Sequence, residues 1–348
     1  MNNGNKATLN TNLIPLYFGT YSEGKDGGIF SAVFSPETGK IHLKDNISIP
    51  QPSYLQLYKK TLYAVSELMC FEGENGGALS AIDTANHQIL TTIPTHGKHP
   101  CHLCLTDNHL FVANYSEGSL SIFTFEQSKE LKPTFQSIQH YGKSVNSQRQ
   151  QMAHVHFVTM DPAGGYLAVC DLGLDQVLLY PYSPSQGLST NATCIPCPPG
   201  AGPRHLTFSQ CGNFLYVLTE LTNTILVYKY HKGEGMFIQE VSTLPDTFIE
   251  INTCAAIRLS PDGTKIVASN RGHDSLAIFI IEQDGKLNFS HHLMTGKCPR
   301  DFNFSPCGNW LLAANQEDDS VFVYQQAGDT YLQTDTINLP KPVCILFG

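Results

Sequence analysis

The sequence is poor in charged residues, tryptophan and arginine. Charged residues make up only 15% of its 348 residues, it has one tryptophan, and its formal net charge is -9. An acidic chain without a basic stripe is poorly suited to the phosphate backbone, so nucleic acid is not expected as a partner. No run of 18 apolar residues occurs, so no membrane-spanning helix is expected either.

No secretory leader is expected, and the number of cysteines is odd. Residues 1–12 are polar and contain no apolar core, which is unlike a signal peptide. Eleven cysteines favour free thiols in a reducing cytosol over a disulfide framework. Cys101 and Cys104 have the spacing of a zinc pair, but in a strand they would face opposite sides. The sequence therefore predicts a cytoplasmic protein without structural zinc.

A repeat of strand, tight turn, strand, loop and strand runs through the chain. Its clearest copies carry their turns at residues 209–212, 260–263 and 305–308. Successive copies are roughly 43 to 52 residues apart and lack the 3.6-residue period of helical repeats. The 28 glycines and 20 prolines agree with many short strands joined by turns. The repeat predicts an all-β fold of four-stranded antiparallel propeller blades.

Six complete copies are accompanied by a seventh that is split between the two ends of the chain. Residues 342–347 would supply its first strand, and residues 16–20 and 28–33 the next two. Such a blade closes the ring through hydrogen bonds between the chain ends and leaves no exposed edge strand. We therefore predict one seven-bladed β-propeller domain over residues 13–348, preceded by a polar tail at residues 1–12.

A polar residue recurs at the end of the second strand of each complete copy. The set comprises Glu67, Asn114, Asp171, Glu220, Asn270 and Asn315. The tight turn makes the first two strands an antiparallel hairpin, so this residue lies on the same rim as the start of the first strand. At or near that start the copies place His102, His154, His156, Arg204, His205 and Arg300. The two sets together predict a polar site around the propeller axis at one rim.

Several members of these sets have simpler explanations. Turn capping accounts for Asn114, Asp171 and Asn315 at least as well as catalysis does. We expect His102 and His205 to be structural and to face between blades. An inward carboxylate such as Glu220 is costly without a partner, and pairing with an arginine would relieve that cost.

Arginine is scarce, and its distribution is uneven. The five arginines are Arg149, Arg204, Arg258, Arg271 and Arg300. Only Arg258 lies in the middle of a predicted strand, where we expect it to be solvated or paired between strands. Guanidinium groups recognise phosphate and carboxylate in a bidentate manner, so the other four predict an anionic small-molecule substrate.

Motifs along nearly the whole chain resemble the bacterial propeller-type lactonase family. They include Gly19-Thr20-Tyr21, Pro52-Ser53-Tyr54-Leu55, Gly202-Pro203-Arg204-His205-Leu206, Ser269-Asn270-Arg271-Gly272 and Pro299-Arg300-Asp301-Phe302. The family includes the propeller form of 6-phosphogluconolactonase and a fungal enzyme that cyclises carboxymuconate. The resemblance implies a propeller lactonase of the pentose phosphate pathway. One departure is Met152-Ala153 before His154, where the family usually has a proline.

The resemblance also implies a set of site residues. Its catalytic members are one histidine of the pair His154 and His156, together with Arg204, Glu220 and Arg271. We expect a histidine or Glu220 to act as acid or base and Arg204 or Arg271 to face the developing oxyanion. The expected substrate-binding residues are Arg149, Arg300, Asn270 and Asp171. Lactones are reactive enough to need neither a serine nucleophile nor a metal, and no cofactor is expected.

Three other functions stay open on the sequence alone. A lactonising cyclase acting on a carboxylated diene would use the same side chains. A metal-dependent lactonase would bind calcium through the axial oxygens. A binding platform of the WD type would need no rim arginines, and the Trp-Asp signature is missing, since Trp310 follows Gly308-Asn309. The chain is expected to be a monomer or a weak homo-oligomer.

Overall fold

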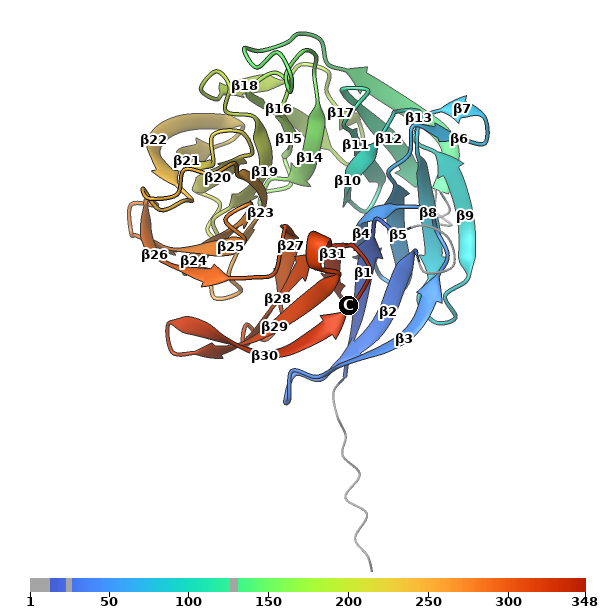
Figure 1. The fold of residues 1–348 in the computed structure, drawn as a ribbon. Coiled ribbons are helices and arrows are strands. Elements are labelled where there is room, and N and C mark those ends of the chain that lie inside the picture. The colour runs from blue at the N-terminus through green and yellow to red at the C-terminus, as the bar shows by residue number, and fades with distance from the viewer. Residues whose placement is uncertain (1–12, 23–26, 126–130) are drawn as a thin grey trace, which may run out of the picture.

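The computed structural model describes residues 13–22, 27–125 and 131–348 and confirms a seven-bladed β-propeller (Figure 1). The tail predicted at residues 1–12 lies outside the described residues. Within the described ranges, no helix is long and apolar enough to cross a membrane. Each blade is an antiparallel sheet, and the first strand of each blade contacts the first strands of its neighbours around the central channel.

The complete blades follow one another in chain order, and the strands of each run from the innermost outward. Blade 1 comprises β4 (Pro52–Tyr58), β5 (Thr61–Ser66), β8 (Ala78–Asp83) and β9 (Ile89–Pro94), with a small hairpin of β6 (Cys70–Phe71) and β7 (Glu74–Asn75) after β5. Blade 2 comprises β10 (Pro100–Leu105), β11 (His109–Asn114), β12 (Ser119–Phe125) and β13 (Leu131–Gln139). Blade 3 comprises β14 (Val155–Met160), β15 (Tyr166–Asp171), β16 (Gln176–Ser183) and β18 (Thr193–Pro196), and β17 (Gly187–Leu188) pairs with the end of β16.

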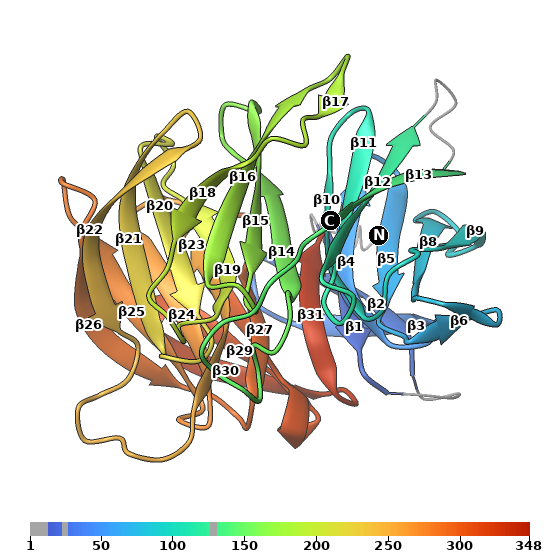
Figure 2. The same cartoon turned by 90° about the horizontal axis from the view of Figure 1, so that it is seen from above.

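The remaining blades continue the same order. Blade 4 comprises β19 (Pro203–Phe208), β20 (Phe214–Thr219), β21 (Thr224–His231) and β22 (Glu234–Ser242). Blade 5 comprises β23 (Thr253–Leu259), β24 (Lys265–Arg271), β25 (Ser275–Ile281) and β26 (Leu287–Met294). Blade 6 comprises β27 (Pro299–Phe304), β28 (Trp310–Asn315), β29 (Ser320–Ala327) and β30 (Thr330–Asn338), with a 3-10 turn, η2 (Gln316–Asp318), after β28. Figure 2 shows the blades from above, with β17 projecting from one end of the ring.

Blade 7 is the split blade that the sequence predicts. Its innermost strand is β31 (Pro342–Phe347), followed outward by β1 (Ile14–Thr20), β2 (Ile29–Phe34) and β3 (Ile41–Ile47). The pairing of β31 with β1 is antiparallel, with Ile345 opposite Phe18. Figure 1 shows the red strand β31 beside the blue strand β1 at the point where the ring closes. Hydrogen bonds between distant parts of the chain therefore complete the propeller.

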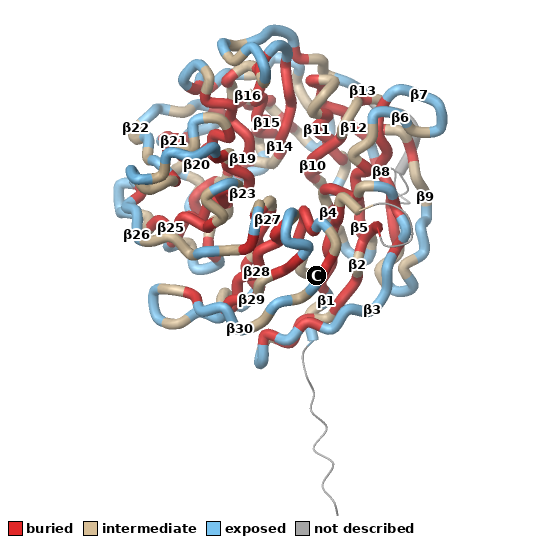
Figure 3. The backbone as a smooth tube through the Cα atoms, in the orientation of Figure 1, coloured by how far each residue is buried: buried red, intermediate tan, exposed pale blue. Residues whose placement is uncertain are grey.

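The hydrophobic core lies between blades rather than at the axis. Phe34 of blade 7 packs edge-on against Trp310 of blade 6, with ring centroids 6.1 Å apart. Buried residues are concentrated in the inner and middle strands (Figure 3). The middle strands are covered on both faces, which explains why their sequences are continuous apolar runs rather than strict alternations. The channel is left free for polar side chains.

Every innermost strand contains a β-bulge near its start. In blade 4, Pro203 pairs with Thr219 and His205 pairs with Leu218, so Arg204 has no residue opposite it. The other six blades show the same shift of register at the same place. The bulged residues around the ring are Ser53, Cys101, His156, Arg204, the pair Ala255 and Ala256, Arg300 and Val343. Bulges re-aim side chains and are frequent beside active sites.

Candidate active site

The bulged residues gather at the end of the channel where the innermost strands begin. In every blade except blade 5, the bulged residue lines a small cavity on the channel axis. The ends of the second strands lie beside these bulges, as the hairpin argument predicts, because Pro203 is opposite Thr219 and Pro299 is opposite Asn315. We call this region the rim site and define it by Tyr21, Glu67, Arg149, His156, Arg204, Glu220, Arg271 and Arg300.

Glu220 is the centre of a cluster of arginines. It follows β20 directly and is only 4% exposed. Nη2 of Arg149 donates to its Oε1 at 2.6 Å, and Nη2 of Arg271 lies 3.4 Å from the same oxygen. Nε of Arg204 lies 3.0 Å from Oε2, close enough for an ion pair, although its N–H does not have hydrogen-bond geometry. The structure thus brings together Arg204, Glu220 and Arg271, and it adds Arg149.

Opposing effects determine the charge of Glu220. Burial would raise the pKa of its carboxyl group, but the guanidinium groups, chiefly those of Arg271 and Arg204, hold that pKa well below its usual range. Glu220 is therefore ionised at neutral pH, and both of its oxygens have cationic neighbours. Such a carboxylate is a poor proton acceptor. Three guanidinium groups around one carboxylate leave a net positive charge at the rim site, which attracts anions to an otherwise acidic protein.

Backbone carbonyl groups of β23 fix the orientation of two of these arginines. Nη1 of Arg204 donates to the carbonyl oxygen of Ala255, and Nη2 of Arg271 donates to that of Cys254 at 2.9 Å. Burial and the neighbouring Arg271 lower the pKa of Arg204 to about 10, so this side chain stays protonated at neutral pH. The two guanidinium groups are pre-positioned donors that need no rearrangement to meet a developing negative charge.

The two histidines of blade 3 occupy different positions. His154 precedes β14, its backbone N–H donates to Asp171 at 2.8 Å, and its ring stacks on Tyr115 with centroids 4.5 Å apart. His156 is the bulged residue and lines the axial cavity. Burial and the charge of Arg204 lower the pKa of His156 well below its usual value, so its imidazole is neutral. Of the predicted pair, His156 is the one that faces the cavity.

A second chain of polar contacts lies across the channel. Nη2 of Arg300 donates to the hydroxyl of Tyr21 at 2.6 Å, and its guanidinium carbon lies 4.7 Å from the centre of the tyrosine ring. The Tyr21 hydroxyl in turn donates to Oε2 of Glu67 at 2.6 Å. Burial raises the pKa of Tyr21, so the phenol keeps its proton. The sequence places Arg300 and Glu67 on this rim, but it assigns no catalytic or binding role to Glu67 or Tyr21.

The axial cavity lies between these two groups of side chains. Its volume is about 20 Å³, and Glu67, His156, Arg204 and Arg300 all line it. Ser53 lines it as well, and the buried Oγ atom of this serine has no hydrogen-bond partner. A polar cavity of this size accommodates about one water molecule. The rim site therefore has a place for a reacting water beside a carboxylate and a neutral imidazole.

Asp171 and Asn270 do not reach the mouth of the channel. Both are fully buried. Asp171 accepts hydrogen bonds from the backbone of His154 and Leu174 and contacts His140 at 2.7 Å. Asn270 exchanges hydrogen bonds with Thr243, including one of 2.8 Å. The sequence predicts that both residues bind substrate; in the structure, protein groups contact both side chains.

The segment that carries Arg149 is held by another buried carboxylate, Asp175. One oxygen of Asp175 accepts from Nε2 of Gln150 and from the backbone N–H of Gly202, each at 2.7 Å. The other oxygen accepts from the backbone N–H of Gly200 at 2.7 Å and from Ser144. This carboxylate therefore connects the Arg149 segment to the approach to β19, which carries Arg204.

The positions of His102 and His205 differ from those expected from the sequence. Both residues line the cavity at the opposite end of the channel, and His205 also lines the axial cavity, so the prediction that they face between blades is wrong. The bulge is the reason, because it interrupts the alternation of side chains and turns consecutive residues toward the axis. The expectation for Arg258 is confirmed, since its Nη2 donates to Asp301 of the neighbouring blade at 2.8 Å.

The polar groups of the rim site suit an anion better than a metal ion. Among the described residues, no three His, Cys, Asp or Glu side chains are grouped closely enough to hold a metal. Glu67 already accepts a hydrogen bond from a phenol, and Glu220 already forms ion pairs with three guanidinium groups. Guanidinium groups are suited to phosphate and carboxylate. The arrangement can bind an anionic substrate and stabilise an oxyanion.

Comparison with known proteins agrees with this chemistry. Residues 15–347 match the family model described as lactonase, 7-bladed β-propeller. The chain is 33% identical to 6-phosphogluconolactonase of Bacillus subtilis (strain 168), over 95% of this chain and 97% of that protein. The periplasmic gluconolactonase of Pseudomonas aeruginosa has a similar structure, with a TM-score of 0.88 and 30% identity over 96% of this chain and 99% of that one.

A further solved structure gives the same result. It is that of a Bacteroides fragilis NCTC 9343 protein described as a candidate 6-phosphogluconolactonase, with a TM-score of 0.90 and 31% identity. The alignment covers 98% of this chain and 99% of that one. Family match, full-length identity and structural similarity all point the same way: this chain belongs to the seven-bladed β-propeller lactonase family and is an enzyme of the lactone-hydrolysing class.

Proposed function

We propose that this protein hydrolyses 6-phosphogluconolactone to 6-phosphogluconate in the pentose phosphate pathway. The observation that carries the proposal is the cluster of three guanidinium groups around the buried Glu220 at the mouth of the channel. A phosphorylated lactone needs cationic groups for its phosphate and donors for its carbonyl oxygen. The relatives described as 6-phosphogluconolactonases support this choice of substrate.

The arginines divide into two roles by their burial. Arg204 and Arg271 are held on backbone carbonyls, with side chains 4% and 13% exposed, and we assign them to the lactone oxyanion. The Arg149 side chain is 37% exposed, the most accessible of the three around Glu220, which suits it to the phosphate. Arg300, held on Tyr21 across the channel, would contact the same anionic tail. In both roles, the donors act on charge that the substrate carries or develops.

We assign the general base to Glu67 rather than to Glu220. Glu67 receives one hydrogen bond, from Tyr21, whereas Glu220 has three cationic neighbours. A water in the axial cavity would transfer a proton to Glu67 as its oxygen bonds to the lactone carbonyl carbon. Collapse of the tetrahedral intermediate then breaks the ring C–O bond, and the proton returns to the departing alkoxide. The neutral His156 orients the water. This route requires no metal.

We also propose that the enzyme acts in the cytoplasm. All eleven cysteines are free thiols, which suits a reducing compartment. The relative from Pseudomonas aeruginosa is described as periplasmic. The compartment of this protein therefore needs a direct test. Fractionation of cells that produce the native protein, followed by immunodetection, should place it in the cytosolic fraction. Recovery in an extracytoplasmic fraction would contradict this assignment.

The deciding experiment is a direct assay of the purified protein. Freshly generated 6-phosphogluconolactone, gluconolactone and carboxymuconate are compared with and without a chelator. We expect rapid opening of the phosphorylated lactone, slower opening of gluconolactone and no effect of the chelator. Preference for carboxymuconate would identify a lactonising cyclase, and loss of activity with the chelator would identify a metal-dependent lactonase. Activity on none of them would favour a binding platform.

A further inference from the structure

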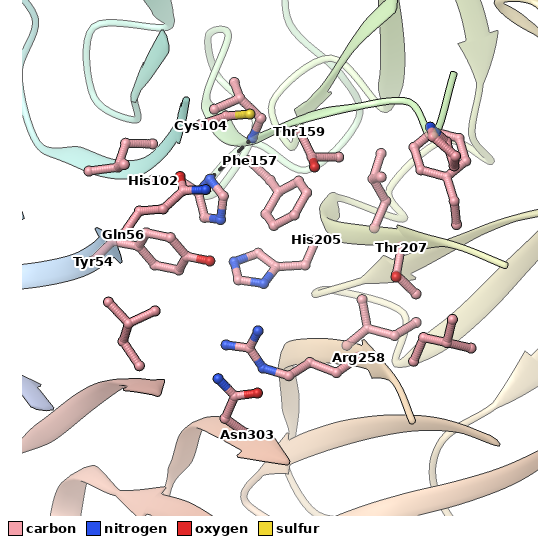
Figure 4. A pocket seen from close by; sticks show the side chains of 18 of the residues that line it. Tyr54, Gln56, His102, Cys104, Phe157, Thr159, His205, Thr207, Arg258 and Asn303 are labelled. Atoms are coloured by element: carbon pink, nitrogen blue, oxygen red, sulfur yellow. Dashed lines mark hydrogen bonds between the residues drawn. The ribbon is translucent and has the colours of Figure 1, made fainter. Parts of the chain in front are cut away.

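The opposite end of the channel contains a second, larger cavity. Its volume is about 580 Å³, within the usual range of small-molecule sites. It is lined by parts of the innermost strands that follow the bulges, including Gln56, His102, Thr207 and Arg258 (Figure 4). We call it the far cavity. The rim site uses none of these four residues, so their arrangement is not explained by the reaction.

Aromatic rings form the inner wall of the far cavity. The ring of His102 lies between those of Tyr54 and Phe157, with centroid distances of 3.8 and 4.1 Å. Phe157 in turn packs against His205 at 4.7 Å. Figure 4 shows these rings converging at the inner end of the cavity. They give it an aromatic surface against which the C–H groups of a ligand can pack.

Two buried polar atoms in this wall have no protein partner. His102 is 3% exposed, and its Nδ1 accepts the backbone N–H of Val158 at 3.5 Å, which assigns the proton to Nε2. That Nε2–H group has no acceptor, and Oε1 of Gln56 has no donor. In Figure 4 the unpartnered nitrogen of His102 points toward the space beside Tyr54 and His205. Buried polar groups in native proteins are normally satisfied, so an unmatched donor and an unmatched acceptor in the wall of one cavity can be matched by a polar molecule inside it.

The far cavity carries one formal charge among the described residues that line it, and that charge is positive. Arg258 uses Nε on the carbonyl of Phe302 and one Nη on Asp301. Its other Nη atom bonds no described protein group, and Figure 4 shows this end of the guanidinium group directed toward Tyr54 and His205. His102 and His205 are neutral there, because burial lowers their pKa values, together with the charge of Arg258 for His102 and of Arg204 for His205. The polar groups at the inner end are therefore mainly donors.

From these groups we propose that the far cavity binds a small hydroxycarboxylate. Its carboxylate would accept hydrogen bonds from Arg258 and from Nε2 of His102. Its hydroxyl groups would bond Gln56, Thr159 and Thr207, and its carbon chain would pack on the aromatic wall. A hydroxylated chain is favoured over a bare anion because most of the cavity offers neutral hydroxyl and amide partners beside a single guanidinium group. This site does not depend on the proposed function of the rim site.

The test uses the full-length protein with sodium gluconate as the probe and isothermal titration as the readout. The variant His102→Phe removes the Nε2 donor and retains an aromatic ring between Tyr54 and Phe157. We expect it to lose one gluconate-binding event or to weaken that event at least tenfold. Lactone turnover should stay within about twofold of wild type. Arg149→Ala at the rim is the matched control and should retain the event that His102→Phe removes.

Three results would overturn the proposal. The first is an unchanged titration in a folded His102→Phe variant, and the second is loss of the binding event in Arg149→Ala alone. The third is equal binding of inorganic phosphate with displacement of gluconate, which would show a general anion site. If His102→Phe does not fold, Gln56→Leu replaces it, because this variant removes the unpartnered acceptor with little change in volume. The same loss of binding is then expected.

Discussion

The two ends of the central channel are built from the same seven strands, but they differ in their chemistry. At the rim site, four arginines and two glutamates lie in two groups of contacts on either side of the axial cavity. At the far cavity, Arg258 is the one charged lining group among the described residues, and neutral rings form the wall. Part of the difference arises at the bulges, because the unpaired residues Arg204 and Arg300 carry charged side chains to the axis. Beyond the bulges, the innermost strands place aromatic rings and neutral polar groups around a larger cavity.

The comparison separates two uses of a buried ion pair. Glu220 keeps three guanidinium groups in fixed positions, which serves a reaction that creates negative charge. The pair of Arg258 with Asp301 joins the innermost strands of two blades, and Asp301 also accepts the backbone N–H of Ile345 in a third blade at 2.8 Å. The ion pairs of Glu220 position groups of a site, and the pair of Arg258 with Asp301 connects neighbouring blades of the ring. Variants should therefore affect activity at one end and stability at the other.

The largest effect is expected for Glu67→Gln at the rim site. Removal of a general base usually costs a factor of about 10² or more in turnover, so kcat should fall by at least about a hundredfold with little change in KM. Steady-state kinetics on 6-phosphogluconolactone would measure it. Glu117→Gln, which changes a carboxylate in an exposed pair with Lys98, is the control. A normal kcat in Glu67→Gln would contradict this assignment and would favour a histidine as the general base.

Arg271→Ala should produce the next largest loss. Removal of one oxyanion donor costs about ten- to a hundredfold in turnover, provided that the donor acts in the transition state. Arg149→Ala should instead raise KM, because we assign Arg149 to the phosphate. The two variants are compared on phosphorylated and unphosphorylated lactone. If Arg149→Ala slows both lactones equally, the division of roles between the arginines is wrong.

Arg258→Met is expected to lower stability while leaving activity nearly unchanged. It leaves the carboxylate of Asp301 buried without its cation, which should lower the free energy of unfolding by about 3 kcal/mol. Lactone turnover of the folded variant should stay within about threefold of wild type. Denaturant unfolding and initial rates on the same preparation provide both numbers. A large loss of turnover at full stability would show that the far cavity takes part in catalysis.

The smallest effect is expected on acidification, which should change stability differently at the two ends of the channel. The pKa of His102 is lowered in the folded protein, so below about pH 6.5 the unfolded chain binds a proton that the folded chain does not, and stability falls. The pKa of Glu220 is also lowered, and its contribution is lost only below about pH 4.5. Thermal melts of His102→Phe and Glu220→Gln against wild type should therefore show differences that begin in separate pH windows. A shared window would contradict the two assignments.

The fold was predictable from the sequence, because a propeller repeats its pattern in every blade. Turns such as residues 260–263, together with the split segments at both ends, determine the blade count and the way the ring closes. The hairpin geometry also placed Arg204, Glu220 and Arg271 on one rim. Each of these inferences depends on local order along the chain, which a single sequence displays directly.

The rest of the site depends on register and on contacts between distant residues. A bulge after Pro203 does not change the apolar pattern that follows, so the sequence could not show that Arg204 and His205 both turn toward the channel. Tyr21 contacts Arg300 across 279 positions of the chain, and no local motif connects them. The contacts of Asp171 and Asn270 likewise depend on partners that only the folded ring brings near.

The repeated bulge has a consequence for how this protein can change. A bulged residue takes no part in the pairing of its strand, so a substitution there leaves the hydrogen-bond ladder of its blade intact. The ring positions held by Ser53, Cys101, His156, Arg204, Arg300 and Val343 therefore present side chains to the axis from one common frame, and Arg204 changes together with its buried partner Glu220. Substitution of a few codons could redirect the chemistry at the axis while the blades stay the same. A library restricted to these positions is a compact starting point for new substrate specificity.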